Sequence, residues 1–288
     1  MDPLLEPARR DRRARQRQRQ ALRRRVAGAL VLAAAAALAF AVWPSGTTRH
    51  ERTDHRNDQR ARSHHRHRRH RARTTARIAK AHPGTAKIVM HGRPRKQVAL
   101  TFDDGFCAAC VARTIAVLRS SGAHATIFPN GTYSTAWKPQ AKAIRKLIAN
   151  GQLTVGNHTF THHDPRTESA SAFESDMRRN EQWIERTFGV TARPFFRPPF
   201  GSYNSDTLRV AGRLGYTQVV LWSATVADSS PRSERYILNA IHQQAKPGAI
   251  VLMHGNYPNT GRVLPRILGL LKGRHIQTVT LDEMLGRR

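Results

Sequence analysis

Two adjacent carboxylates, Asp103 and Asp104, follow the apolar run Val98–Phe102. Such a pair is costly unless a cation or a proton separates the two charges. Strict strand alternation would send the side chains to opposite faces, so both can serve one site only if the chain turns there. Gly105 permits such a turn. The alternative interpretation is that one of the two aspartates caps the helix that follows.

A pair of histidines, His158 and His162, follows the apolar run Leu153–Val155. Their spacing predicts that both rings lie on one face of a helical turn, and it is common for two imidazole ligands of one metal ion. In a chain with 15 histidines such a pair alone is weak support. Two histidines and one carboxylate would leave coordination positions open, which is typical of a catalytic metal site.

Arg197 and His254 also end apolar runs, Pro194–Phe196 and Ala249–Met253. Two prolines after Arg197 predict a rigid loop that could aim its guanidinium, although a surface salt bridge is the alternative. A lone histidine at a strand end more often packs than catalyses. The recurrence of these residue types after successive runs, where parallel α/β folds place their active sites, favours one shared site.

Such a site needs parallel strands whose ends meet, and the chain alternates short apolar runs with helical patterns. The predicted strands are Val98–Phe102, Ala125–Phe128, Leu153–Val155, Pro194–Phe196, Thr217–Trp222, Ala249–Met253 and Ile276–Leu281. The predicted helices are Cys110–Ser121, Pro139–Asn150, Ser169–Phe188, Ser205–Leu214, Ser233–Gln244 and Arg262–Leu271. The pattern indicates an α/β fold, and either a barrel-like closure or an open doubly wound sheet would satisfy it.

From about Lys96 to Leu285 the chain resembles the NodB-type polysaccharide deacetylases, a carbohydrate esterase family. Five motifs appear in order: Thr101–Gly105, His158–His162, Arg197–Gly201, a weaker one around Asp228, and Leu252–His254. The resemblance implies a distorted (β/α) barrel with seven strands. It also implies a metal-dependent hydrolase that removes N-acetyl groups from a cell-envelope polysaccharide, either peptidoglycan or a chitin-like glycan.

The resemblance further implies that Asp104, His158 and His162 bind a divalent metal ion, usually zinc in this family. Asp103 would be the general base that takes a proton from a metal-bound water, and His254 would be the general acid. These roles agree with the needs of amide hydrolysis, in which the carbonyl must be polarised and the leaving amine protonated.

Four other residues receive roles by the same resemblance. Arg197 would hold the base in position, Asp228 would tune the protonation of the acid, and Leu252 would line the pocket for the acetyl methyl group. A backbone N–H at Phe200 would contact the oxyanion. The fourth motif departs from the usual Asp-Trp pattern, because Ser229 follows Asp228.

Cys107 and Cys110 are the only cysteines, and they lie just after the aspartate pair. In an exported domain this spacing predicts a local disulfide that braces the loop after Asp104. A thioredoxin-like redox pair is the alternative.

One apolar run, residues 26–43, is uncharged and reaches the lower length limit for a membrane-spanning helix. Arginine-rich sequence precedes it, so the positive-inside rule predicts a cytoplasmic segment at 1–25 and a transmembrane anchor at 26–43. The protein would then be a single-pass cell-membrane protein with its folded domain on the cell-wall side. A cleaved signal peptide is the alternative, and it would give a secreted protein.

The net charge of +30 is concentrated in residues 1–97, which carry 26 of the 49 basic and 6 of the 19 acidic residues. Residues 44–95 are predicted to form a disordered Arg/His-rich linker, which leaves 96–288 as the folded domain. We expect the linker to attract anionic envelope polymers, and we expect no specific nucleic-acid target. The linker contains four irregularly spaced histidines, His64, His65, His67 and His70. Because many positively charged arginines surround them, we do not expect them to bind a metal ion.

Two other functions remain open from the sequence. A non-haem Fe(II) oxygenase also uses two histidines and one carboxylate. A non-catalytic, membrane-tethered protein that binds a wall polymer would explain the basic segment, but it gives no reason for Asp103, Arg197 and His254 to occur together.

Overall fold

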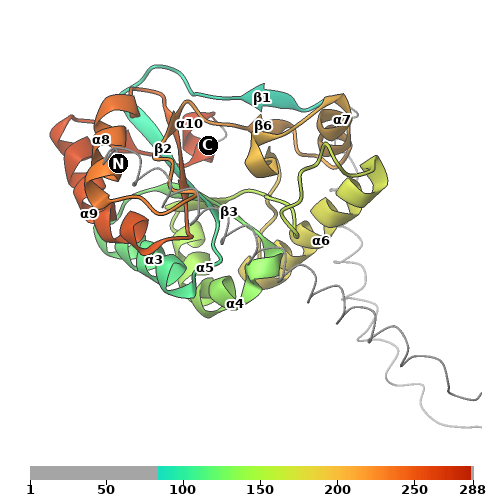
Figure 1. Cartoon of the computed structure of the whole chain (residues 1–288), viewed down its shortest axis with the longest axis horizontal. Coiled ribbons are helices and arrows are strands. Elements are labelled where there is room, and N and C mark those ends of the chain that lie inside the picture. The colour runs from blue at the N-terminus through green and yellow to red at the C-terminus, as the bar shows by residue number, and fades with distance from the viewer. Residues whose placement is uncertain (1–83, 287–288) are drawn as a thin grey trace, which may run out of the picture. The chain divides into compact units, whose positions relative to one another are not determined.

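The computed structural model describes residues 84–286, in which parallel strands are surrounded by helices (Figure 1). The strands are β1 Lys87–Val89, β2 Gln97–Asp104, β3 Ala125–Pro129, β4 Leu153–Val155, β5 Phe195–Phe196, β6 Gln218–Val220, β7 Ala224–Thr225, β8 Ile250–His254 and β9 Gln277–Thr278. The predicted anchor at 26–43 and most of the predicted linker lie outside the described residues. Within residues 84–286, none of the helices combines the length and apolar character required to cross a bilayer.

All ladder pairs between these strands are parallel. One sheet has the order β4-β3-β2-β8-β7, with β9 also paired to β2, and the other has the order β1-β6-β5. A single bridge between Asn157 and Phe196 links the end of β4 to β5. The long central strand β2 therefore ends beside β3 and β8, and its last residues Asp103 and Asp104 have neighbours on both sides.

All six predicted helices are confirmed, with ends shifted by a few residues. The helices are α3 Ala108–Ser121, α4 Ser134–Trp137, α5 Ala141–Ala149, α6 Ala170–Phe188, α7 Ser205–Arg213, α8 Glu234–Gln244, α9 Pro258–Gly273 and α10 Leu281–Met284. Short 3₁₀ turns are η1 Gly131–Tyr133, η2 Lys138–Gln140 and η3 Pro199–Gly201. Ser169 and Ser233 cap α6 and α8 by accepting backbone N–H bonds.

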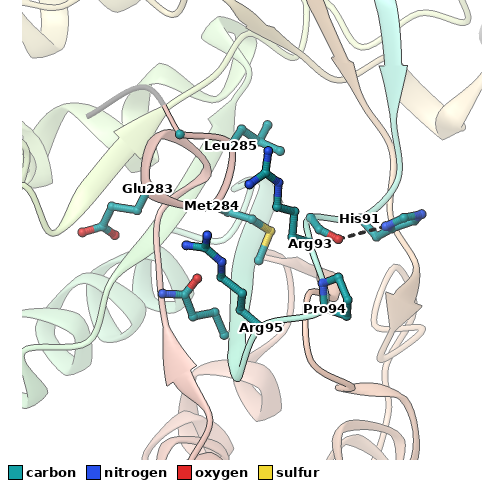
Figure 2. Close-up of a pocket in the computed structure, with 10 residues that line it drawn as sticks. His91, Arg93, Pro94, Arg95, Glu283, Met284 and Leu285 are labelled. Atoms are coloured by element: carbon teal, nitrogen blue, oxygen red, sulfur yellow. Dashed lines mark hydrogen bonds between the residues drawn. The ribbon is translucent and has the colours of Figure 1, made fainter.

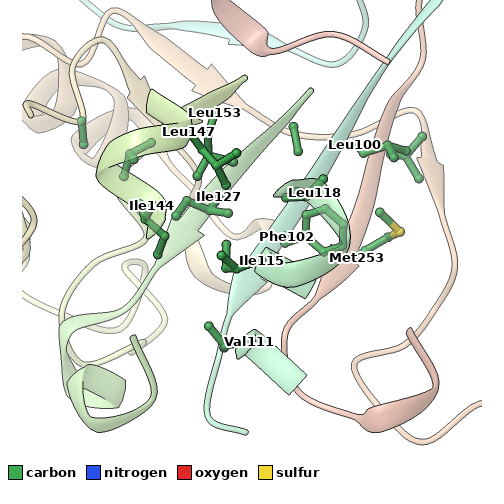
Figure 3. Packing of buried hydrophobic residues seen from close by; sticks show 14 of the residues in the cluster. Leu100, Phe102, Val111, Ile115, Leu118, Ile127, Ile144, Leu147, Leu153 and Met253 are labelled. Atoms are coloured by element: carbon green, nitrogen blue, oxygen red, sulfur yellow. The ribbon is translucent and has the colours of Figure 1, made fainter. Parts of the chain in front are cut away.

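The helices form an outer layer in which α8, α9, α3, α5, α6 and α7 pack in turn against their neighbours (Figure 1). The main core lies between this layer and the strands. In Figure 3, Leu100 and Phe102 of β2 lie with Ile115 and Leu118 of α3, and Met253 of β8 joins them. Alternate residues of β2 thus bury one face against helices, as the period of a strand requires.

The other face of the strands surrounds a second cluster of buried apolar side chains. Ala99, Phe128, Phe195, Val220 and Ile250 belong to it, and each comes from a different strand. Both sheets therefore share one interior, as a distorted barrel does. All seven predicted strands are present, as β2, β3, β4, β5, β6, β8 and β9, and residues 84–286 contain two further strands. The unpredicted strands β1 and β7 are only three and two residues long, too short to produce a periodic pattern.

The predicted boundary between linker and domain is also wrong. Residues 84–95 were assigned to the disordered linker, but β1 pairs with β6 in register from Lys87 to Val89. His91 then forms an antiparallel bridge to Ala249. The apolar signal of this segment is confined to a few residues between charged ones, so composition alone did not separate it from the linker.

Candidate active site

A cavity of about 550 Å³ opens at the carboxyl ends of the strands. Seven predicted site residues line it: Asp103, Asp104, His158, His162, Phe200, Leu252 and His254. The other two, Arg197 and Asp228, are buried and hydrogen-bond to residues of this lining. The structure therefore brings all nine together at one place.

Asp103 is held by a fully buried arginine. Arg197 donates from Nη1 to Asp103 Oδ1 and to Thr101 Oγ1, each at 2.7 Å. Its other nitrogens donate to the carbonyls of Val220 and Leu221 at 3.0 and 3.2 Å. Burial lowers the pKa of Arg197, and the charge of Asp103 opposes that change. Because a guanidinium keeps its proton throughout the ordinary pH range, Asp103 has a permanent cationic partner.

Asp104 joins Asp103 in one site because the chain turns at Asp104 itself. Asp104 has φ 63° and Gly105 has φ 93°, so both are left-handed. A Cβ at Gly105 would lie 2.5 Å from the indole of Trp137. The same indole donates from Nε1 to the Asp104 carbonyl at 2.8 Å. Glycine is therefore required here for its backbone conformation and for its small size.

The two histidines converge, but not through the predicted helical turn. The segment from His158 to His162 is a loop, and Thr159 and His162 both have φ 62°. Asp176 Oδ2 accepts the backbone N–H groups of Phe160 and Thr161 at 2.9 and 3.0 Å, in place of helical carbonyl partners. The prediction of a helix was wrong because distant side chains hold this backbone.

The ligand atoms of Asp104, His158 and His162 lie within 4.8 Å of one another. The Nε2 atoms of His158 and His162 lie 3.3 and 3.2 Å from Asp104 Oδ1. Among the described residues, this buried oxygen has no hydrogen-bond partner. A carboxylate oxygen facing two imidazole nitrogens without hydrogen bonds fits a divalent cation of the zinc type, which takes nitrogen and oxygen ligands.

Hydrogen bonding prepares His158 for such a role. His158 Nδ1 lies 2.7 Å from the Arg197 carbonyl oxygen, which can only accept, so Nδ1 carries the proton. The Nε2 atom is then left with its lone pair toward Asp104 in the neutral ring. This partner on the far nitrogen is the usual support of a metal-binding histidine.

The charges of the site favour a cation. Burial would raise the pKa of Asp104, but the close approach of His158 and the imidazole charges hold it well below its usual range. Burial opposes protonation of His158, yet the charges of Asp103 and Asp104 outweigh burial and raise its pKa. Burial and the charge of His158 lower the pKa of His162 to about 4. The carboxylates thus attract positive charge, and a metal ion would displace the proton that they otherwise draw to His158.

His254 lies opposite Asp103 in the register of β8 and β2. Its Nδ1 is 2.8 Å from Asp228 Oδ1, and its backbone N–H donates to Asp228 Oδ2 at 3.0 Å. Thr260 Oγ1 donates to the same carboxylate at 2.6 Å. Burial opposes protonation of His254, but the hydrogen bond and charge of Asp228 raise its pKa. Asp228 is therefore placed to tune His254 although a serine follows it in the sequence.

Strained backbone is concentrated around the cavity. Six non-glycine residues between 84 and 286 have positive φ, and five of them line the site or lie between its ligands: Asp104, Thr159, His162, Phe200 and Ala227. Phe200 has φ 60° in the rigid proline turn, and its ring contacts His162 with centroids 4.7 Å apart. Residues persist in such conformations only where their surroundings impose them, and they gather at functional sites.

Sequence reasoning missed one buried polar residue of the site. Asn256 donates from Nδ2 to Asp104 Oδ2 at 2.8 Å and accepts the Gly105 N–H at 3.0 Å. It therefore orients Asp104 so that the unpartnered Oδ1 faces the two histidines. Its place two residues after His254 was the only sequence signal, and that signal does not reveal the partner in β2.

Cys107 and Cys110 are joined by a disulfide, with Cα atoms 5.2 Å apart. Cys107 is also the N-cap of α3, which begins directly after the turn that carries Asp104. The link closes the short segment between the carboxylates and the helix.

A second cavity, of about 620 Å³, lies at the opposite end of β2 (Figure 2). In Figure 2, Arg93 and Arg95 extend from the segment before β2 toward Met284 and Leu285 of the C-terminal turn. Its volume exceeds that of the first cavity, but it contains none of the predicted site residues. We therefore place the chemistry in the first cavity.

Comparison with known proteins identifies the family of the chain. Residues 91–219 match the sequence profile of polysaccharide deacetylases. A peptidoglycan-N-acetylglucosamine deacetylase of Bacillus cereus is 32% identical over 195 residues, which cover 66% of this chain and 88% of the relative. The chain belongs to the polysaccharide deacetylase family. The resemblance drawn from the motifs is confirmed, and the deacetylase is a hydrolase of amide bonds.

Solved structures show the same fold. Bacillus subtilis PdaA, a family 4 carbohydrate esterase, matches with a TM-score of 0.62 at 25% identity, over 75% of this chain and 89% of that one. A family 4 pseudoenzyme from Bacillus anthracis also matches with a TM-score of 0.62, at 23% identity over 70% of each chain. This fold also occurs in a pseudoenzyme, so the fold alone does not establish activity. The side chains of the site decide it.

Proposed function

We propose that this deacetylase removes N-acetyl groups from a cell-envelope polysaccharide and that Asp104, His158 and His162 hold a divalent metal ion, zinc. The observation that carries the proposal is the unpartnered Asp104 Oδ1 facing two imidazole nitrogens. Asp103 and His254, paired across β2 and β8, adjoin this group in the same cavity. These five side chains match the needs of amide hydrolysis better than those of an oxygenase. Amide hydrolysis needs a general acid such as His254 to protonate the leaving amine, whereas an oxygenase has no leaving amine.

The bound metal would polarise the acetyl carbonyl and lower the pKa of a water molecule that it binds. Asp103 accepts a proton from the attacking water, and its Oδ1 is already occupied by Arg197, which leaves Oδ2 for this task. The backbone N–H of Phe200, whose ring packs against His162 in the lining of the cavity, is proposed to donate to the oxyanion.

His254 completes the reaction by donating a proton to the sugar amine as the carbon–nitrogen bond breaks. Its Nδ1 is engaged by Asp228, so the proton is given from Nε2. The raised pKa of His254 favours the protonated ring, which a general acid requires. Leu252 is proposed to accept the acetyl methyl group, since it lines the cavity on the same strand face as His254.

Peptidoglycan is the proposed substrate class, with chitin-like glycans as the alternative. The peptidoglycan deacetylases among the relatives support this choice.

We also propose that the domain works outside the cytoplasm, because a structural disulfide is typical of oxidising compartments. The apolar run at 26–43 supports a membrane anchor, and the basic linker supports contact with anionic envelope polymers.

Acetate release from N-acetylglucosamine polymers tests the proposal when it is measured together with bound metal. Asp103→Asn should abolish acetate release and leave the metal content nearly intact. His158→Ala should lower both, because it removes a ligand. His163→Ala is the matched control, since this neighbouring ring is 66% exposed and is not a predicted ligand. A chain that binds glycan without any acetate release would instead be a non-catalytic wall-binding protein.

A further inference from the structure

Two of the most exposed aromatic side chains within residues 84–286 line the same cavity. Phe106 is 48% exposed and Phe200 is 66% exposed, and both line the site. Large apolar side chains in contact with water, gathered at a cavity, mark a surface that binds something apolar on one face. Phe200 packs against His162, one of the proposed metal-binding residues. Phe106 has no role in the proposed mechanism.

Phe106 belongs to a group of three aromatic residues, which we call the aromatic ledge: Phe106, Tyr133 and Tyr257. The Phe106 ring packs edge-to-face with Tyr133 at a centroid distance of 5.9 Å and with Tyr257 at 5.6 Å. The three residues follow β2, β3 and β8, the strands that end at the cavity. Edge-to-face contacts of this kind hold a ring in one orientation while part of it stays exposed.

The backbone beneath Phe106 is also held on both sides. Cys107, the next residue, is linked to Cys110 by the disulfide. The Phe106 N–H lies 3.4 Å from Asn256 Oδ1, which also accepts the Gly105 N–H. A surface that is fixed before binding loses little conformational entropy when a ligand arrives.

The ledge adjoins the reacting centre. Tyr133 and the proposed metal ligand Asp104 line the same cavity. The cavity of about 550 Å³ extends from this side to Phe200 and Trp222. An acetamido group alone does not need this space, whereas a sugar ring with a neighbour would fill it.

We propose that the aromatic ledge binds the sugar unit next to the one that carries the reacting acetyl group. This inference rests on the proposed function and assigns residues to the neighbouring sugar of its polysaccharide substrate. A pyranose ring has hydroxyl groups around its rim and C–H groups on its faces. Its face can therefore bury against the exposed Phe106 ring, and the hydroxyl group of Tyr133, which also lines the cavity, is proposed to meet the rim.

Calorimetry tests this with N-acetylglucosamine and its β-1,4-linked tetrasaccharide, on the full-length protein carrying Asp103→Asn so that the sugars are not consumed. The measured quantity is the ratio of the two affinities. Phe106→Ala and Phe106→Leu should each lower the preference for the tetrasaccharide about fivefold, the effect of losing an aromatic contact. Phe106→Tyr, which keeps the ring, should restore the preference.

Tyr236→Ala is the matched control, because Tyr236 is 47% exposed but lies on α8 outside the cavity. It should leave the affinity ratio unchanged. An unaltered affinity ratio in both the Phe106→Ala and Phe106→Leu proteins, or an equal loss of tetrasaccharide preference in the control, would overturn the proposal. Lack of any tetrasaccharide preference in the parent protein overturns it too. Acetate release by the protein without Asp103→Asn is measured in parallel, so failure of the proposed activity is seen separately from failure of the ledge.

Discussion

His254 illustrates how a single carboxylate sets the behaviour of a proposed catalytic side chain. Asp228 accepts from both the ring and the backbone of His254, and it raises the pKa of the ring against the effect of burial. Asp228 is itself fixed by Thr260. A general acid must carry its proton, so activity should fall as the pH rises through the pKa of His254.

Asp228→Asn should therefore move the alkaline limb of the kcat/KM profile to lower pH. The substitution removes the negative charge that stabilises the imidazolium, so the pKa of His254 falls toward its ordinary value. The pH dependence of acetate release measures this shift. Asp206→Asn, on the exposed surface of α7, serves as control and should leave the limb in place. An unmoved limb in Asp228→Asn would remove His254 from the role of acid.

Asn256 is a positioning residue for Asp104. Asn256→Ala should weaken metal binding by about 10- to 100-fold, the usual effect of removing a partner of a metal ligand. Metal affinity measured by competition with a chelator reports this directly. Asn259→Ala is a control from the next turn, because that side chain bonds to the Arg232 carbonyl instead. Equal affinities in the parent and Asn256→Ala proteins would show that Asp104 needs no such support.

At the scale of elements, the turn at the end of β2 decides whether two adjacent carboxylates can share a site. The sequence predicted the need for this turn from Asp103, Asp104 and Gly105. It did not predict that Asp104 itself adopts a positive φ, or that Trp137 packs on Gly105. Those features depend on α4, which is remote from β2 in the sequence.

Gly105→Ala should destabilise the fold more than Gly122→Ala does. Both glycines have positive φ, so each alanine costs about 1–2 kcal/mol of backbone strain. Only at Gly105 would the new Cβ also meet another group, the indole of Trp137, since the Gly122 position is open. Urea unfolding of the two variants compares the free energies. Equal losses in the free energy of unfolding would mean that the Trp137 side chain can move away from the new Cβ without destabilising the fold.

The helices were predictable because their apolar spacing and serine caps are local features, as α6 and α8 show. The convergence of His158 and His162 was predicted correctly, but from a helix that does not exist. The loop is held by Asp176 from α6, and no local pattern encodes that partner. Asn256 was missed for the same reason. Residue types and their order thus predicted which side chains gather at the cavity, while the contacts that shape it are long-range.

At the scale of the whole molecule, the described domain has two distinct ends. The carboxyl ends of the strands carry the candidate active site, and the other end of β2 carries the arginine-lined cavity near α10 (Figure 2). The chain enters the domain through β1, which pairs with β6. The basic N-terminal sequence, whose anchor and linker roles stay predictions, therefore joins a strand of the folded domain.

A chain that begins at residue 84 should be more stable than one that begins at residue 96. The shorter chain lacks β1, so β6 loses its strand partner on that side. Val219 and Val220, which pair with residues of β1, then become more exposed. Each kcal/mol lost should lower the melting temperature by about 2–4 °C in a domain of this size. Thermal unfolding of both chains measures the difference. Identical melting temperatures would mean that β1 adds nothing to the domain.

We propose that amide hydrolysis by the deacetylase depends on a cation held by Asp104, His158 and His162. The decisive experiment follows acetate release from an N-acetylglucosamine polymer through chelation and re-addition of zinc. We expect the full-length protein to lose acetate release when its metal is removed and to regain it with about one equivalent of zinc per chain. Undiminished acetate release by protein shown to be free of metal would mean that hydrolysis needs no cation at this site.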